Sequence, residues 1–134
     1  MNQLTDQWRS WTMSLTDAEG RVFDERPWGT FTVLDDTMTD HKVKRIVVNA
    51  NKRLSYQRHE KRAEHWFVIS GTATAILDGE TIELGPRQSL DINIGQAHRC
   101  ENRTDAPVVF IEIQTGTYFG EDDIVRLEDD FGRV

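Results

Sequence analysis

The sequence predicts an all-β domain built as a barrel, a sandwich or a jelly roll. Downstream of Gly29, nine short runs rich in Val, Ile, Thr and aromatic residues are separated by turn residues, a pattern typical of antiparallel strands. The dipeptide Asp78-Gly79 between two of these runs is the strongest hairpin signal in the chain. No helical pattern interrupts the runs, so the strands must cover one another in two sheets or in one closed sheet.

The helical pattern of this chain precedes the strands. Leu4, Trp8, Trp11 and Leu15 recur at helical spacing and predict a short amphipathic helix over residues 4–15. We expect this helix to pack on the barrel or on a second subunit.

A polar connector and the strands follow the predicted helix. Residues 16–26 are polar, and Pro27-Trp28-Gly29 then breaks the chain. Residues 1–25 are therefore predicted to form the helix and connector, and residues 26–134 the barrel. The predicted strands are Thr30–Leu34, Lys42–Val48, Arg53–His59, His65–Ser70, Thr72–Leu77, Glu80–Leu84, Ser89–Ile94, His98–Arg103 and Val108–Thr115.

The last segment, Gly116–Val134, is acidic but is not predicted to be a disordered tail. It lacks the alternating ligands and central glycine of a calcium loop. Tyr118, Phe119 and Ile124 are among its apolar residues, which are too many for a disordered acidic tail. We therefore expect an ordered strap across the barrel.

Several predicted strands carry apolar residues on both of their faces. Trp66, Phe67, Val68 and Ile69 follow one another, although successive side chains of a strand point to opposite faces. Both faces of that strand are therefore predicted to be covered, one by the barrel interior and the other by a second sheet, the helix or a partner. This pattern favours a homodimer.

Length, composition and charge narrow the classes of function. The 134 residues fit one domain, and the net charge of −7 argues against the broad basic field of a general nucleic-acid binder. The N-terminus lacks a secretory signal pattern, and no apolar run reaches the roughly 20 residues of a membrane span. We expect a cytoplasmic protein that binds neither nucleic acid nor membranes. Cys100, the one cysteine, is predicted to be a small core residue.

Basic residues are concentrated in one part of this acidic chain. Half of its sixteen Lys and Arg lie between residues 42 and 62, with Glu60 the one acid among them. Such a patch suits a small anion such as a phosphorylated metabolite. The alternative is a set of solvated strand edges on which lysines discourage pairing. These eight residues are Lys42, Lys44, Arg45, Lys52, Arg53, Arg58, Lys61 and Arg62.

The same region contains candidate metal ligands. Gln57 and His59 are two apart in a predicted strand, so their side chains point to the same face. Glu64 follows after a connection of hairpin length, and His98 joins the group if the chain folds back. Histidine and carboxylate are ordinary ligands of divalent transition metals, and a glutamine carbonyl can serve beside them.

Two motifs in this region resemble the signature motifs of the cupin superfamily. They read Gln57-x-His59-x4-Glu64-x6-Gly71 and Gly95-x2-His98-x3-Asn102. The resemblance implies a cupin double-stranded β-helix, a jelly-roll barrel with one metal near its mouth. Gln57 stands where the commonest pattern has a histidine, and Asn93 stands where it has a proline.

A wider set of motifs is similar to the C-terminal cupin domain of type II mannose-6-phosphate isomerases. The resemblance covers residues 26–133 and implies a domain that stands alone, without the guanylyltransferase domain fused to it in many relatives. The motifs are Arg26-Pro27-Trp28-Gly29, Lys42-Val43-Lys44-Arg45, Leu54-Ser55-x-Gln57-x-His59-x2-Arg62-Ala63-Glu64-His65-Trp66, Ser70-Gly71-Thr72-Ala73 and Ile113-Gln114-x-Gly116-x-Tyr118-x-Gly120-Glu121-Asp122-Asp123-Ile124-Val125-Arg126.

This resemblance implies an isomerase of mannose 6-phosphate and fructose 6-phosphate that acts through an enediol(ate). One divalent metal bound by Gln57, His59, Glu64 and His98 would stabilise the negative charge that develops on the C1 and C2 oxygens. Zinc is the first expectation, with manganese, cobalt, nickel and iron open because this ligand set admits all of them.

Other residues are candidates for proton transfer and for substrate binding. Glu112 is the first candidate base, because it shares a strand face with Phe110 and Gln114; the alternative role is a hydrogen bond to a basic residue of the barrel. Arg62 is expected to take a phosphate or to neutralise the enediolate. Substrate contacts are expected from Lys44, from Ser55 and from Tyr118, which would close over the mouth.

Two departures from the family pattern keep other functions open. Glu60 and Lys61 stand where relatives often carry histidines, which changes the charge of the rim and removes proton-transfer groups. The first alternative is an isomerase or modifying enzyme for another phosphosugar or nucleotide-linked sugar. The second is a non-catalytic sugar-binding cupin.

Overall fold

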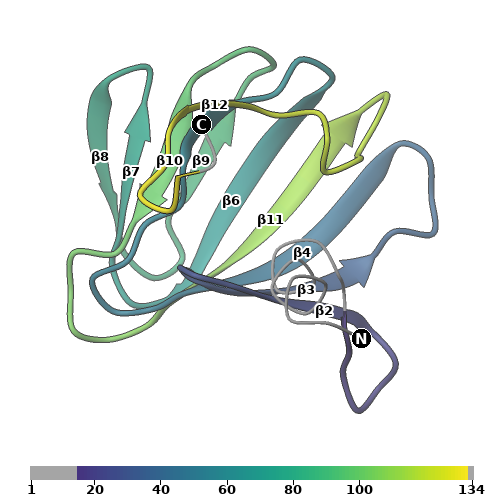
Figure 1. Ribbon diagram of the computed structural model, residues 1–134, viewed down its shortest axis with the longest axis horizontal. Coiled ribbons are helices and arrows are strands. Elements are labelled where there is room, and N and C mark those ends of the chain that lie inside the picture. The colour runs from purple at the N-terminus through teal and green to yellow at the C-terminus, as the bar shows by residue number, and fades with distance from the viewer. Residues whose placement is uncertain (1–14, 133–134) are drawn as a thin grey trace.

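In the computed structural model, which describes residues 15–132, two antiparallel β-sheets face each other around a central space (Figure 1). The seven-stranded sheet has the order β1 (Leu15–Thr16), β2 (Val22–Arg26), β3 (Gly29–Asp35), β4 (His41–Val48), β11 (Val108–Gly116), β6 (Arg62–Ser70) and β9 (Ser89–Ile92). The five-stranded sheet has the order β12 (Val125–Glu128), β5 (Tyr56–Arg58), β10 (His98–Glu101), β7 (Ala73–Leu77) and β8 (Glu80–Leu84). The predicted all-β class is confirmed, and each of the nine predicted strands corresponds to an observed one.

The beginning of the chain differs from the prediction. The helix predicted over residues 4–15 lies outside the described residues except for Leu15, which belongs to β1 and pairs with Phe23. No helix occurs within residues 15–132, and so none there could span a membrane. The prediction of a connector over residues 16–26 is wrong for residues 22–26, which form β2 and pair with β3, whereas residues 17–21 form a turn. The polar residues of β2 hid this strand, since Asp24 is buried inside the barrel while Glu25 is exposed.

The C-terminal segment is ordered, as predicted, and ends in a further strand. β12 pairs with β5 at the edge of the five-stranded sheet. Between β11 and β12 the chain crosses the upper end of the barrel in the view of Figure 1, where it is coloured yellow. Residues 117–124 of this crossing are called the strap below.

Inward-facing side chains change from apolar to polar along the central strands. On β6 the buried residues run from Val68 and Trp66 to Glu64 and Arg62. On β11 they run from Phe110 to Glu112 and Gln114, and on β4 from Val48 and Ile46 to Lys44. One end of the barrel is therefore a packed apolar core, and the other end is lined by buried charges beneath the strap.

The buried cysteine and one glycine illustrate how tightly this core is packed. Cys100 is fully buried, which confirms its predicted place in the core, and burial raises the pKa of its thiol to about 12. Gly29 has a φ of +154°, and a Cβ at this position would lie 1.9 Å from the carbonyl oxygen of Val47. Only glycine therefore fits where β3 turns in against β4.

The outer face of the seven-stranded sheet carries exposed apolar side chains. Phe67 and Ile69 on β6 and Ile113 on β11 are exposed, and Phe67 lies opposite Ile111 in the ladder. The sequence pattern predicts that a second sheet, the N-terminal helix or a partner subunit covers this face. The homodimer stays a prediction.

Asn102, from the second motif, joins the end of β4 to the loop between β10 and β11. Its buried amide nitrogen donates to the carbonyl oxygens of Val48, Asn49 and Ala106 at 3.0, 3.2 and 2.7 Å. Its side-chain oxygen accepts from the backbone nitrogen and the hydroxyl of Thr104 at 3.0 and 2.7 Å. This motif residue therefore has a structural role.

We expect Asn102→Ala to lower the free energy of unfolding by about 2–4 kcal/mol, because several buried backbone groups lose their partner at once. Urea unfolding at 25 °C measures the change. Asn93→Ala is the control, because Asn93 belongs to the same motif and its side chain is exposed. A loss below about 0.5 kcal/mol for Asn102→Ala, the range of an ordinary surface change, would contradict this role.

Candidate functional site

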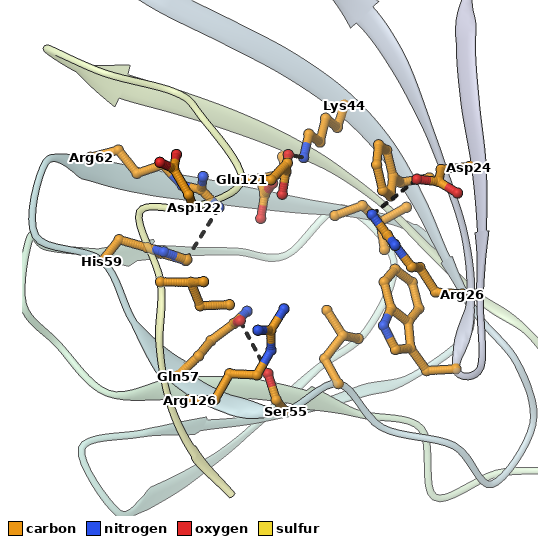
Figure 2. Close-up of a pocket in the computed structure, with 16 residues that line it drawn as sticks. Asp24, Arg26, Lys44, Ser55, Gln57, His59, Arg62, Glu121, Asp122 and Arg126 are labelled. Atoms are coloured by element: carbon orange, nitrogen blue, oxygen red, sulfur yellow. Dashed lines mark hydrogen bonds and ion pairs between the residues drawn. The ribbon is translucent and has the colours of Figure 1, made fainter. Parts of the chain in front are cut away.

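The polar end of the barrel encloses a cavity of about 370 Å³ beneath the strap. Six predicted site residues line it: Lys44, Ser55, Gln57, His59, Arg62 and Glu112. Figure 2 shows side chains from both sheets and from the strap converging on this space. A pocket of this size, with charged groups on several walls, suits a small polar metabolite.

Three buried side chains meet beside the cavity. Nε2 of His59 lies 3.1 Å from one carboxylate oxygen of Glu64, and Nε2 of His98 lies 3.5 Å from the other. Ligand atoms of the three residues all lie within 4.8 Å of one another. The strands β6 and β10 and the end of β5 bring these residues together although up to 39 positions, from 59 to 98, separate them in sequence.

Backbone carbonyl groups orient both imidazole rings. Nδ1 of His59 lies 2.6 Å from the carbonyl oxygen of Asp123, and Nδ1 of His98 lies 2.9 Å from that of Gln96. A carbonyl oxygen only accepts hydrogen bonds, so each Nδ1 carries a proton and donates it. In the neutral rings each Nε2 then presents a lone pair toward Glu64, the orientation that metal-binding histidines need.

The surroundings of Glu64 favour positive charge. Burial by itself would raise the pKa of Glu64, but His98, His59 and Arg62 outweigh burial and hold it well below its usual range. Burial would lower the pKa of His98, but Glu64 outweighs it, and the pKa is raised. Among the described residues, Nε2 of His98 has no hydrogen-bond partner. A divalent cation beside these atoms would satisfy this nitrogen, so the donor set fits such a metal.

Gln57 lies next to the three residues. It is opposite His98 in the ladder between β5 and β10, and its side chain lines the cavity. Its side-chain oxygen accepts a hydrogen bond from the hydroxyl of Ser55 at 3.1 Å. The two side chains therefore lie on the same face, and Ser55 orients the amide.

Glu112 is held beside Glu64 by a shared donor. The indole nitrogen of Trp66 lies 3.1 Å from an oxygen of Glu64 and 3.1 Å from an oxygen of Glu112. The amide of Gln114 donates to the other oxygen of Glu112 at 2.8 Å. Burial, followed by repulsion from Glu64, raises the pKa of Glu112 to about 8. The raised pKa is the direction expected for a carboxyl group in a dry barrel.

Two basic residues, Lys44 and Arg62, line the cavity, and Lys42 lies near the Lys44 ion pair. Lys44 is buried, faces inward on β4 and forms an ion pair with Glu121 of the strap. Lys42 approaches the same carboxylate oxygen at 3.9 Å. Arg62 donates from Nε to Glu64 at 3.1 Å, and one of its terminal nitrogens lies 3.3 Å from Nε2 of His59. Partial burial opposes the effect, but Lys44, Arg62 and Lys42 lower the pKa of Glu121 to about 2.

Comparison with known proteins identifies the family of the chain. The model of the family described as mannose-6-phosphate isomerase C-terminal matches residues 14–129. The chain belongs to this family. The earlier resemblance to its cupin domain is thereby confirmed.

The relatives in this family are longer proteins. The chain is 45% identical over 124 residues to the alginate biosynthesis protein AlgA of Pseudomonas aeruginosa, covering 88% of this chain and 26% of AlgA. It is 44% identical over 109 residues to the mannose-1-phosphate guanylyltransferase ManC of Salmonella typhimurium, covering 81% of this chain and 22% of ManC. The chain therefore spans about a quarter of the length of these relatives.

A solved structure supports the fold. A protein of Klebsiella pneumoniae with a double-stranded β-helix domain superposes with a TM-score of 0.64 at 20% identity, over 73% of this chain and 78% of that one. This likeness agrees with the predicted double-stranded β-helix.

The two departures from the pattern of the mannose-6-phosphate isomerase C-terminal family lie on the rim. The side chain of Glu60 is exposed and pairs with Arg58, with 3.2 Å between Oε1 and the arginine Nε. Lys61 is exposed, and its ammonium lies 5.0 Å from the ring centre of Tyr118. Both side chains therefore make contacts away from the three buried groups.

Tyr118 and Asp123 hold the strap in place. Tyr118, predicted to close over the mouth, donates to Asp122 and is not among the described residues that line the cavity. The carboxylate of Asp123 accepts from the backbone nitrogens of Glu60 and Lys61, both at 3.0 Å. The carbonyl oxygen of Asp123 also accepts a hydrogen bond from His59. The strap therefore helps to position this candidate metal ligand.

Several cavity residues were missed by the sequence reasoning. They are Asp24, Arg26 and Trp28 from the first hairpin, and Glu121, Asp122, Ile124 and Arg126 from the strap and β12. Charge complementarity between the acidic C-terminal segment and the basic residues 42–62 was visible in the sequence and could have indicated Glu121. Asp24 had no comparable signal, because its strand was predicted to be a connector, whereas Arg26 belonged to a quoted motif that was given no role in the site.

Proposed function

We propose that this chain is a metal-dependent phosphosugar isomerase that interconverts mannose 6-phosphate and fructose 6-phosphate through an enediol(ate). The observation that carries the proposal is the group His59, Glu64 and His98 beside a cavity that also contains Glu112 and Arg62. Membership of the mannose-6-phosphate isomerase C-terminal family supports the same substrate class.

The charges of the cavity support a small anionic ligand. Lys44 and Arg62 are both buried and both line the cavity. Lys44 pairs with Glu121 and Arg62 with Glu64, but Nη1 of Arg62 is buried and has no hydrogen-bond partner among residues 15–132, so an additional anion can bind there. A phosphorylated sugar brings that anion together with hydroxyl groups that the polar walls can bind, which is the partner class proposed here.

His59, Glu64 and His98 would hold the metal, with Gln57 as a fourth ligand that Ser55 orients. When bound, a divalent metal acts as a Lewis acid toward substrate oxygens that become negatively charged, and zinc is the first expectation.

The remaining residues of the cavity supply positioning and proton transfer. Glu112 moves the proton between C2 and C1 of the sugar, and Trp66 and Gln114 fix its two oxygens. The Arg62 guanidinium stabilises negative charge on the enediolate or on the phosphate. The strap, held by Asp123, limits access of water to these groups.

The test of this function is exchange of the C2 proton of mannose 6-phosphate in deuterated water, followed by NMR. Protein reloaded with zinc or manganese is expected to introduce deuterium and to produce fructose 6-phosphate, and chelator-treated protein is not. No label in mannose 6-phosphate, glucose 6-phosphate or fructose 6-phosphate with any of the candidate metals would overturn the proposal. The remaining candidates would then be an enzyme for another sugar or a sugar-binding cupin.

A further inference from the structure

We infer that Lys42, Lys44 and Arg62 form the subsite for the anionic group of the ligand, and that Glu121 is a resident carboxylate that a phosphate monoester displaces. The inference deepens the proposed function, because it rests on an anionic ligand entering the cavity.

Two ammonium groups converge on one carboxylate. Lys44 Nζ forms an ion pair with Oε1 of Glu121, and Lys42 Nζ lies 3.9 Å from the same oxygen. Lys42 and Lys44 alternate along β4, so both side chains point to the same face of the sheet. The Lys44 side chain is 4% exposed, while that of Glu121 is 50% exposed. The basic side of the subsite is therefore built into the barrel, and its acidic partner is at the mouth.

Arg62 provides a third cationic group, and one of its nitrogens can still donate a hydrogen bond to a ligand. Its Nε and one terminal nitrogen are directed at Glu64 and His59, and both contacts are within the buried group. Among residues 15–132 the other terminal nitrogen, Nη1, is buried and has no hydrogen-bond partner. Buried donors are normally satisfied, so this nitrogen points to a ligand that accepts from it. Arg62 also contributes to the lowered pKa of Glu121, so its charge acts in the same region.

Charge favours the exchange of Glu121 for a phosphate. Lys42 and Lys44 share the carboxylate of Glu121, and Arg62 pairs with Glu64, so three cations face two carboxylates and one positive charge is left unbalanced. A phosphate monoester carries a charge of about −1.5 to −2 at neutral pH and has three acceptor oxygens, so it can serve several donors at once. Glu121 keeps Lys44 paired while the cavity lacks such a ligand.

The structure allows Glu121 to move while the rest of the strap stays in place. Asp123 is fixed by hydrogen bonds to Glu60, Lys61 and His59, and Tyr118 is fixed by Asp122 and Lys61. Glu121 lies between these anchors, and its interactions with the barrel are the two lysine contacts. Rotation of this half-exposed side chain is therefore sufficient to vacate the subsite.

The test is binding of inorganic phosphate to the full chain as purified, measured by isothermal titration calorimetry. Glu121→Gln is expected to bind phosphate roughly tenfold more tightly than the unchanged protein, the factor expected when one charge-assisted contact no longer competes. Glu128→Gln is the matched control, because it makes the same substitution on β12 at an exposed residue that pairs with Arg99 and is not among the described residues that line the cavity. It is expected to change the affinity less than about twofold, as expected for a screened charge without direct contact.

A second variant tests the basic side directly. Lys44→Met keeps an unbranched stem of similar length and removes the ammonium, and phosphate binding is expected to weaken at least tenfold, as expected for loss of a charge-assisted contact. The inference is overturned by equal affinities for Glu121→Gln and Glu128→Gln, by undetectable binding to both, or by unchanged binding to Lys44→Met. These results do not depend on isomerase activity. If the variants change phosphate binding as expected but no proton exchange occurs, the subsite is retained and the isomerase is rejected. If proton exchange occurs but the variants do not change phosphate binding, the isomerase is retained and the subsite is rejected.

Discussion

Replacing Glu64 by glutamine is expected to abolish metal binding and, with it, isomerisation. Glu64 is the residue that both histidines face, at 3.1 and 3.5 Å, and its charge also balances Arg62. The neutral amide offers an oxygen of weaker donor strength and leaves Arg62 without its carboxylate. Loss of an outer-shell partner of a metal ligand typically costs up to about 100-fold in metal affinity. Because Glu64 is proposed to bind the metal directly, we expect the affinity for zinc to fall by more than that. Competition with a chromogenic chelator measures this affinity, and NMR measures isomerisation.

His65→Gln is the matched control for this experiment. His65 follows Glu64 on β6, points to the outer face and pairs with Asp91 at 2.6 Å. It is expected to keep both the metal and the activity. If Glu64→Gln retained zinc with unchanged affinity, His59, Glu64 and His98 would be a buried hydrogen-bonded group without a metal.

Replacing Glu112 by glutamine is expected to reduce kcat by about 10²–10⁴-fold, the contribution typical of a positioned acid or base. The amide keeps the shape of the side chain and can still accept from Trp66, but it cannot take up a proton from carbon. Metal content and KM are expected to change little, because Glu112 is proposed to act on the substrate. Steady-state kinetics with metal analysis of the same sample separates these effects.

Glu101→Gln is the control for loss of a buried carboxylate. Glu101 is buried on β10 and pairs with Arg53 and Arg103, and it does not line the cavity among the described residues. The kcat of the Glu101→Gln variant is expected to match that of the unchanged protein. A kcat for Glu112→Gln within about threefold of that value, far below a typical acid–base contribution, would leave Glu112 as a hydrogen-bonding partner of Trp66 and Gln114.

The central strands were predictable because local patterns specify them. β4 and β11 carry alternating side chains whose inner residues are buried, such as Lys44 and Ile46 on one and Phe110 and Glu112 on the other. Periodicity could not decide whether Lys44 faces the barrel or the solvent. Lys44 lies opposite Glu112 in the ladder between β4 and β11, so the two side chains point to the same face. Both are buried, which shows that this face is the interior of the barrel.

The ends of the chain were less predictable for a physical reason. β2 buries Asp24 and exposes apolar Val22, which reverses the pattern by which strands are recognised. β12 is a short edge strand whose Val125 and Leu127 are exposed, so no alternation marked it. Both strands are defined by backbone pairing with β3 and β5, and side-chain patterns carry little of that information.

Residue types at fixed spacings were sufficient to predict the all-β class, the strand order along the chain, the candidate ligands and the family. Three contacts became visible in the folded chain alone: His98 faces Glu64, Glu112 shares the indole of Trp66 with Glu64, and Glu121 reaches Lys44. These contacts join residues 34, 48 and 77 positions apart. Their geometry follows from sheet pairing and from the path of the strap, which no local pattern records.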